Sequence, residues 1–325
     1  MKRYPCVYIV IANWNEQKLL QECLTSIKDF TDYPNFQIVV IDNGSTDGSA
    51  KMIRQKFSWV KLIENKVNMG FAKANNQGIK FAIREGADYI FLLSNDTRVI
   101  HRDWLTRVIE IAEANPNVGI VGCKLVYPDG MIQHAGGVIN VRGIAFHLGI
   151  GKPDNGTYDE VKDVDYVTGA AFMIKRGLVQ KIGLIDEGFF PALFEDTDYC
   201  VRAKMAGYRV VYNPKTTIIH YEGVTVKKRP MLKKNFIMHK NRIRFMLLNF
   251  PVKWLIKRVK YEFKTLISIV VEKKDKARKL SLLNVRLHNE WYPNLVAFIM
   301  GYLENFKNLN DILQKRKNRK CKIWY

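Results

Sequence analysis

Short apolar runs alternate with amphipathic segments through the first two thirds of the chain. Five of these runs are rich in β-branched residues and predict buried strands at residues 7–12, 37–42, 60–64, 89–93 and 118–125. Four segments repeat apolar positions at helical spacing and predict helices at residues 17–29, 49–56, 71–85 and 103–115. This alternation predicts an α/β fold with a mostly parallel sheet that helices cover on both faces.

The pattern changes after residue 126. Residues 127–163 are rich in Gly, Asp and Pro, which predicts a hairpin and a long loop over the C-terminal edge of the sheet. Strand character returns at residues 165–175, 208–213 and 217–221. A helix is predicted from about Glu195 to Gly207, where the glycine would end it.

The charge is distributed unevenly. The chain has 325 residues with 52 Lys+Arg and 31 Asp+Glu, a net charge of +21. Residues 1–226 hold 26 basic and 25 acidic side chains, a balance of +1, whereas residues 227–325 hold 26 and 6, a balance of +20. We therefore expect a nearly neutral globular domain over 1–226 and a basic helical region over 227–325. In the latter, basic and apolar residues lie on separate faces of predicted helices at 253–270 and 295–313.

Several classes of protein are disfavoured. The longest uncharged run has 13 residues, Trp291 to Leu303, which is shorter than the ~18 that suggest a membrane-spanning helix. The N-terminus fits a buried first strand better than a signal peptide. Five scattered cysteines give no disulfide framework or zinc motif, as expected in a reducing cytosol. The glycine-rich phosphate loops GxGxxG and GxxxxGK[ST] are absent.

Polar clusters follow four of the predicted strands, at residues 13–16, 42–47, 65–70 and 94–97. Ligands in open α/β sheets bind beyond the carboxyl ends of the strands, so these clusters predict a site at one edge. Asp42 can accept the imide N–H of a pyrimidine base, or it can cap the turn before the next helix. Asp96 can hold Mg²⁺ or Mn²⁺ against a diphosphate, or it can cap a helix.

Residues 195–198 place three carboxylates at a predicted helix N-terminus. The helix dipole stabilises a carboxylate anion there, which suits a general base that deprotonates a sugar hydroxyl. The alternative is a solvated acidic first turn. His220 is either a functional residue or an ordinary histidine beyond a short strand. Gly169 and Ala170 allow close approach of a ligand, or tight packing.

Eight segments, taken together and in this order, resemble the inverting nucleotide-sugar glycosyltransferases of family 2, which have the GT-A fold. The segments are VYIVIANWNE, VVIDNGSTDGS, NKVNMGFAKANNQGI, FLLSNDT, VGCKLVYPDGMIQHAGG, YVTGAAFMIKR, LIDEGFFPALFEDTDYCVRAKMAGYRVVYNP and IIHYEG. They run from about Cys6 to Gly223 and are most similar to the rhamnosyltransferase-like branch, which builds surface polysaccharides.

The resemblance implies a role for each matching residue. Asp196, in the ED pair of the family, would be the catalytic base, with Glu195 beside it. Asp96 matches the last acid of the DxD-type motif and would bind a divalent metal, which His220 would approach. Position and resemblance together predict the following substrate-binding residues: Ala12, Asn13, Glu16, Asp42, Asn68, Gly70, Asn76, Asn95, Gly169 and Ala170.

The implied reaction is a single displacement with inversion, in which Asp196 deprotonates the acceptor hydroxyl. Two departures from the family pattern qualify it. The DxD position reads Ser94-Asn95-Asp96, so the first acid is missing and the requirement for Mg²⁺ or Mn²⁺ stays open. The QxxRW motif of processive members is absent, which favours the addition of one sugar per encounter.

The expected partners are a nucleoside-diphosphate-sugar donor and a glycan or polyprenyl-linked acceptor. The basic, apolar-striped region favours peripheral attachment to an anionic membrane at its cytosolic face. Self-association, packing on the catalytic domain and nucleic-acid binding are the alternatives, and no nucleic-acid motif supports the last. Two other functions stay open: a sugar-nucleotide nucleotidyltransferase, which usually has a basic Gly-rich loop where this chain reads IANWNEQ, and a membrane or nucleic-acid binding protein with a vestigial transferase domain.

Overall fold

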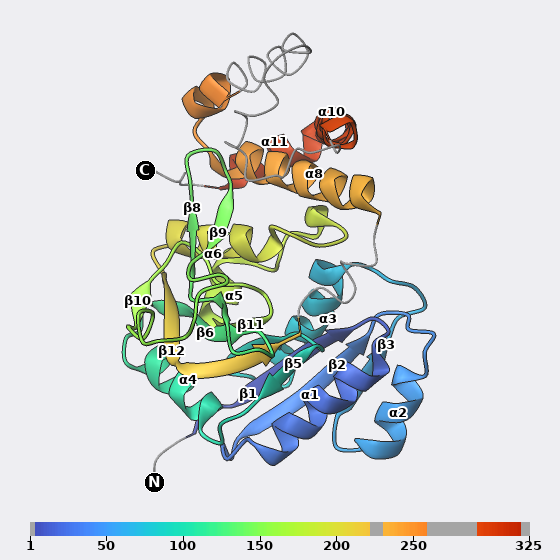
Figure 1. Cartoon of the computed structure of the whole chain (residues 1–325), viewed down its shortest axis with the longest axis vertical. Helices are drawn as coiled ribbons and strands as arrows, with labels where there is room; N and C mark the ends of the chain where they lie inside the picture. The colour runs from blue at the N-terminus through green and yellow to red at the C-terminus, as the bar shows by residue number, and fades with distance from the viewer. Residues whose placement is uncertain (1–3, 222–229, 259–290, 320–325) are drawn as a thin grey trace. The chain divides into compact units, whose positions relative to one another are not determined.

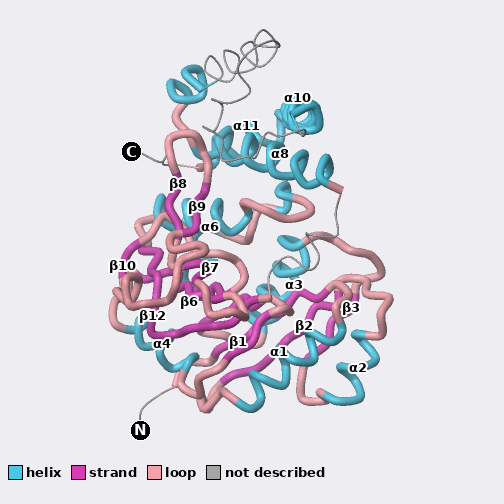
Figure 2. The backbone as a smooth tube through the Cα atoms, in the orientation of Figure 1, coloured by secondary structure: helices cyan, strands magenta, loops and turns pink. Residues whose placement is uncertain are grey.

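The chain forms two compact units, seen in a computed structural model that describes residues 4–221, 230–258 and 291–319 (Figures 1 and 2). Unit 1 consists of Met1–Ile139 and Ala145–Val224, and unit 2 of Asn140–Ile144 and Thr225–Tyr325. The division falls close to the change in charge at residue 226. A hairpin tip from the first part of the chain groups with unit 2.

Unit 1 is built on one large mixed sheet with the order β10-β12-β6-β11-β4-β1-β2-β3. Its parallel half consists of β1 (Val7–Asn13), β2 (Phe36–Asp42), β3 (Lys61–Glu64) and β4 (Tyr89–Leu93). The other half contains β6 (Val118–Val126), β11 (Ala171–Lys175) and β12 (Arg209–His220). Short strands at the margin are β5 (Thr97–Val99), β7 (Ile132–His134) and β10 (Lys162–Asp163). The predicted α/β fold is confirmed.

Helices cover both faces of this sheet (Figure 1). One face buries a large apolar cluster with α1 (Gln17–Asp29), α2 (Ser49–Lys56) and α4 (Trp104–Glu113). The opposite face is covered by α3 (Phe71–Arg84) and α6 (Glu195–Met205), and α5 (Arg176–Ile182) and the short helix η1 (Glu187–Phe189) precede α6. Alternate residues of the central strands point to each face, so both faces bury apolar side chains.

The second half of the sheet differs from the prediction in three places. Within the predicted strand 165–175, only β11 joins the sheet, and it lies antiparallel between β4 and β6. The two strands predicted at 208–213 and 217–221 form the single strand β12, whose register shifts between Asn213 and Thr217. Pro214 lies in that shift and cannot donate to the ladder. The Gly-rich stretch contains β7, β10 and the predicted hairpin, formed by β8 (Gly137–Ile139) and β9 (Ala145–His147).

The described residues of unit 2 from 230 onward are mostly helical, as predicted, and form α8 (Met231–Asn249), α10 (Trp291–Lys307) and α11 (Leu309–Asn318). A Cβ atom on Gly301 would lie 2.9 Å from the backbone nitrogen of Lys240, so α10 and α8 pack closely at this glycine. The guanidinium of Arg316 donates to the Leu247 and Phe250 carbonyls at the end of α8. The helix predicted at 295–313 is therefore two helices that meet near Asn308. Most of the helix predicted at 253–270 lies outside the described residues.

Across the described ranges, no helix combines the length and the apolar character that a bilayer-spanning segment needs.

Candidate active site

Asn13 joins the carboxyl ends of three strands. Its Nδ2 donates to Asp42 Oδ1 at 3.2 Å and to Ser45 Oγ at 3.2 Å, and its Oδ1 accepts from Asn95 Nδ2 at 2.7 Å. Asp42 Oδ2 accepts the Ser45 N–H at 3.1 Å. Asn13 and Asp42 are buried. Each Asp42 oxygen keeps a further acceptor site, so the carboxylate can still accept a donor from a base.

A second amide network shapes the loop after β3. Asn68 Oδ1 accepts from Asn43 Nδ2 at 3.0 Å and from the Gly70 N–H at 2.8 Å. Asn65 Nδ2 in turn donates to Asn43 Oδ1 at 3.1 Å. Gly70 has φ 83°, and a Cβ atom there would lie 2.7 Å from the Phe190 ring, so only glycine fits. Asn68 and Gly70 therefore give the loop its shape.

One carboxylate caps two helices beside this network. Asp47 Oδ2 accepts the Gln17 N–H at the start of α1 at 2.8 Å, and Oδ1 accepts the Ser49 N–H at the start of α2 at 3.0 Å. Burial acts to raise the pKa of Asp47, but the hydrogen bonds from Ser49 and Gln17 outweigh it and lower the pKa. Ala12 lies half-exposed near the end of β1, and Glu16 lies half-exposed just before α1, where its backbone is left-handed with φ 62°.

The pairing of β5 with β12 brings Asp96 to His220. His220 Nε2 lies 3.1 Å from Asp96 Oδ1, and Nδ1 lies 2.6 Å from Gln133 Oε1. The Ser94 hydroxyl also contacts the Asp96 carboxylate. Burial acts to raise the pKa of Asp96, but the hydrogen bond and charge of His220, together with Ser94, hold the pKa below its usual value. Gln133 was not singled out from the sequence, because its partner lies 87 residues away.

The Asp96 carboxylate and the His220 imidazole are suitable ligands for a hard divalent cation. His220 Nε2 and Asp96 Oδ1 share a hydrogen bond at 3.1 Å, and a divalent cation that replaced the shared proton would be bound by the same two atoms. Over the ranges that the structure describes, no three His, Cys, Asp or Glu side chains form a metal-binding group. The remaining ligands would be oxygens of a diphosphate or water.

Asp196 lies in the first turn of α6 and is held by hydrogen bonds to both oxygens. Its Oδ2 accepts the Gly169 N–H at 2.9 Å, and Oδ1 accepts the Thr197 N–H at 2.6 Å and its hydroxyl at 3.2 Å. A Cβ atom on Gly169 would lie 3.0 Å from the Phe71 ring, so a side chain would crowd this position. The next residue, Ala170, accepts the Ser94 N–H at 2.9 Å and so links this segment to the end of β4.

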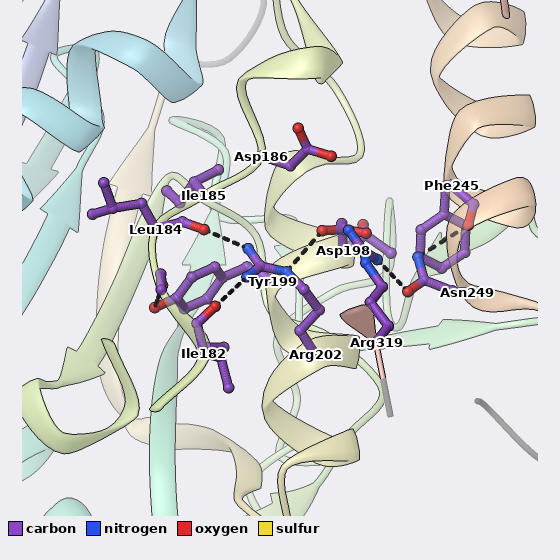
Figure 3. A network of polar contacts seen from close by, with 12 residues as sticks. Ile182, Leu184, Ile185, Asp186, Asp198, Tyr199, Arg202, Phe245, Asn249 and Arg319 are labelled. Atoms are coloured by element: carbon purple, nitrogen blue, oxygen red, sulfur yellow. Dashed lines mark hydrogen bonds and ion pairs between the residues drawn. The ribbon is translucent and has the colours of Figure 1, made fainter. Parts of the chain in front are cut away.

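The three carboxylates of residues 195–198 have different surroundings. Asp198 is fully buried and pairs with Arg202 Nε at 3.1 Å. Arg202 also donates to the carbonyls of Ile182 at 2.8 Å and Leu184 at 2.7 Å (Figure 3). Asp198 is therefore part of a structural clamp, which the i,i+4 spacing to Arg202 could have indicated. Glu195 is buried, and burial and the charge of Asp196 raise its pKa well above the usual range.

Asn76 requires a correction. It was expected to lie along the nucleotide sugar, but its side chain is buried and both ends of its amide hold a loop of unit 1. Nδ2 donates to the Ile185 carbonyl at 2.9 Å and to Glu187 Oε1 at 3.0 Å, and Oδ1 accepts the Ile185 N–H at 3.1 Å. Asn76 therefore acts on the loop before α6 rather than on a ligand.

Three aromatic side chains that sequence reasoning missed gather near these groups. His134 Nδ1 lies 2.9 Å from His147 Nδ1, and both rings pack against Tyr166. His134 Nε2 and the Tyr166 hydroxyl are buried without a partner in the described parts of the chain. Burial, with the charges of His147 and His220, lowers the pKa of His134 well below its usual value, so the ring stays neutral. His134 and Tyr166 lie in two of the segments quoted from the sequence, at 121–137 and 166–176, whereas His147 lies in none of them.

Comparisons with known proteins identify the family and the fold. Residues 8–183 match the family model described as Glycosyl transferase family 2. A protein of Sinorhizobium fredii, y4gI, itself uncharacterised, is 31% identical over 234 residues, which are 69% of this chain and 25% of that protein. The N-acetylglucosaminyl-diphospho-decaprenol L-rhamnosyltransferase of Mycobacterium tuberculosis is 23% identical over 247 residues, 68% of this chain and 78% of that enzyme.

A solved structure shares the fold. The mannosyltransferase of Pyrobaculum calidifontis, in complex with GDP-Man and Mn²⁺, superposes with a TM-score of 0.58 at 18% identity. The match covers 94% of this chain and 88% of that one, and it confirms the expected GT-A fold. Because the family model also covers more than half of the sequence, this chain belongs to glycosyl transferase family 2.

Proposed function

We propose that this chain transfers one sugar per encounter, with inversion, from a nucleoside-diphosphate sugar to a glycan or lipid-linked glycan in surface polysaccharide synthesis. The observation that carries the proposal is the continuous path between two carboxylates. Asp96, beside His220, connects through Ser94 and Ala170 to Gly169, whose N–H holds Asp196. The Asp96 end of this path suits a metal-bound diphosphate, and the Asp196 end suits the acceptor hydroxyl that acts as the nucleophile.

The nucleotide would bind at the strand-end network. Asp42 would accept the imide N–H of the base, while Asn13, on β1 between β2 and β4, holds the carboxylate and is itself held by Asn95. Asp96 and His220 would hold a Mg²⁺ or Mn²⁺ ion, which neutralises the charge of the diphosphate leaving group when bound. The relative solved with Mn²⁺ supports the use of a divalent ion.

Asp196 would act as the general base. The acceptor oxygen forms a bond to the anomeric carbon, its proton passes to the Asp196 carboxylate, and the bond from the anomeric carbon to the diphosphate oxygen breaks. Attack from the face opposite the leaving group inverts the configuration, and no covalent intermediate forms. Asp198 is unsuited to this role because it is paired with Arg202 in the interior.

The name of the Mycobacterium tuberculosis relative supports a rhamnose donor and a polyprenyl-linked acceptor. The test is a panel of nucleotide sugars, with release of nucleoside diphosphate measured with and without acceptor, and with Mg²⁺, Mn²⁺ or a chelator. We expect acceptor-dependent release from one donor class, weakened by chelation. Pyrophosphate formed from a nucleoside triphosphate and a sugar phosphate would instead identify a nucleotidyltransferase.

For unit 2 we propose attachment to an anionic membrane at its cytosolic face. In α10, Ala297, Gly301 and Asn305 form the buried face that packs toward α8. The opposite face is apolar and exposed, with exposures of 47% at Ile299, 57% at Leu303 and 75% at Phe306. The surrounding region carries a charge of +20. Two copies of this positively charged region would repel each other. Nucleic acid offers negative charge without an apolar surface for these side chains, whereas an anionic bilayer offers both negative charge and an apolar interior.

Sedimentation of the full chain with vesicles tests this attachment. We expect binding to phosphatidylcholine mixed with phosphatidylglycerol, little binding to phosphatidylcholine alone, and about tenfold weaker binding for Leu303→Ser with Phe306→Ser. Val67→Ser removes an apolar side chain that is 62% exposed in unit 1 and should leave binding unchanged. Equal binding of all three proteins would contradict the proposal, and loss of a dimer in the double variant would indicate self-association instead.

A further inference from the structure

Two adjacent carboxyl groups at the start of α6 have opposite surroundings. Asp196 accepts three hydrogen bonds, one from Gly169 and two from Thr197. Glu195 is 5% exposed, and its Oε2 atom is buried without a partner in the described parts of the chain. The Glu195 carboxyl accepts backbone hydrogen bonds from its own N–H and from that of Leu193. The first group is built to carry a negative charge, and the second is not.

Ionising Glu195 would be unfavourable for two reasons. A buried carboxylate oxygen without a donor loses its hydration and gains nothing in return. A second negative charge would then lie next to Asp196. Burial is the larger effect and the charge of Asp196 the smaller, and both raise the pKa of Glu195, which the two backbone hydrogen bonds only partly offset.

The other titratable groups around these residues do not favour a charged Glu195. Burial raises the pKa of both Tyr166 and Cys200, so they stay neutral near Asp196. Along α6, Lys204 is paired with Asp165, and Asp198 is paired with Arg202. Asp196 is therefore the charged neighbour that raises the pKa of Glu195.

The backbone before Glu195 needs support. Leu193 and Phe194 have φ values of 84° and 72°, and two consecutive non-glycine residues in the left-handed region are unfavourable. The Glu195 carboxyl holds this turn through the N–H of Leu193.

We infer that Glu195 is a positioning residue that works as an uncharged carboxylic acid: it holds the Leu193–Phe194 turn that aims Asp196 and adds no negative charge beside it. The link to catalysis rests on the proposed function of Asp196. The charge state of Glu195 does not.

Unfolding at different pH values tests the charge state without any assay of activity. The denatured chain ionises Glu195 above the ordinary glutamate pKa of 4.5, whereas the folded chain keeps the proton. Stability from this group is therefore complete below that value and is lost as the pH rises toward the folded pKa. Between pH 5 and 8, the unfolding constant of the wild type should rise relative to Glu195→Gln by up to about tenfold per pH unit. Glu22→Gln, on an exposed position of α1, should show no such trend.

The outcome against the inference is a stability difference between Glu195→Gln and the wild type that stays constant with pH. That result would mean that Glu195 is ionised in the folded protein.

Kinetics with the active donor test the positioning role. Glu195→Gln keeps the acceptor for the Leu193 N–H, so its kcat should match that of the wild type within about twofold. The acid limb of its pH profile should lie at the same pH as in the wild type. Glu195→Ala removes that acceptor, and kcat should fall about 10- to 100-fold with the donor KM unchanged, because misplacing a base costs rate rather than binding.

Two results would overturn the role. An acid limb shifted about one unit lower in Glu195→Gln would mean that the native side chain is an anion that raises the pKa of Asp196. A full kcat in Glu195→Ala, with the fold intact, would mean that it positions nothing. If the wild type transfers no sugar from any donor, the proposed function fails, and the pH dependence of unfolding still decides the charge state.

Discussion

The proposed nucleotide end and the proposed reaction end of the site satisfy their buried polar groups differently. At the nucleotide end, Asn13 and Asp42 bond to each other and to neighbouring loops. At the reaction end, buried atoms of Glu195, His134 and Tyr166 lack partners within the described residues. Complete networks hold a shape before a ligand arrives, while unpartnered groups lower stability and keep hydrogen-bonding capacity in reserve. Under the proposed function, the first end would be preorganised for binding the nucleotide, and the second would keep unsatisfied polar groups at the place of the reaction.

The largest effect is expected at the reaction end. Asp196→Asn should lower kcat by about 10²- to 10⁴-fold with little change in the donor KM, because the amide cannot take the proton of the acceptor. Release of nucleoside diphosphate at saturating donor measures it. The matched variant Asp198→Asn disturbs a buried ion pair, so it should reduce stability more than chemistry. Full activity in Asp196→Asn would remove Asp196 as the base.

A change at the nucleotide end should have the opposite kinetic pattern. Asn13→Ala leaves Asp42 and Asn95 each without one partner, which should cost about 1–3 kcal/mol of stability. We expect the donor KM to rise about tenfold while kcat changes less, measured by initial rates over a range of donor concentrations. A loss confined to kcat would show that the two ends are not separable in function.

The smallest effect compares two buried tyrosines. Tyr166→Phe removes an unpartnered hydroxyl and should stabilise the protein by up to about 1 kcal/mol. Tyr212→Phe removes a hydroxyl that donates to the Tyr158 carbonyl at 3.0 Å and should destabilise it by about 1 kcal/mol. Urea denaturation of both variants measures the difference in sign. The same sign for both would mean that the Tyr166 hydroxyl has a partner after all.

Local pattern was sufficient to predict most of the first half of unit 1. The strands β1 to β4 and the helices between them follow from periodicity, and parallel topology then brings Asn13 and Asp42 to one edge. The second half depends on long-range pairing that periodicity does not contain. The antiparallel insertion of β11 and the approach of His220 to Asp96, 124 residues apart, are of this kind.

Side-chain roles were predictable where one residue type in one place limits the chemistry. The acidic start of α6 was such a place, and the structure adds that Asp198 is paired with Arg202 and that Glu195 is buried. The role of Asn76 was not predictable, because an asparagine on a helix can bind a ligand or a loop equally well. Its partner, Ile185, is 109 residues away and is identified only by the fold.

The capping of two helices by Asp47 constrains how this site can bind a negatively charged donor. Helix N-termini are common phosphate sites, but those of α1 and α2 already bind a carboxylate of the protein. At the start of α3, the Phe71 N–H bonds the Pro191 carbonyl, and α6 begins with acidic residues. The starts of these four helices are therefore partly occupied or acidic, which disfavours a diphosphate there. Under the proposed function, cations would balance the charge of the diphosphate, so we expect the affinity for donor to depend on divalent salt even though the DxD motif is incomplete.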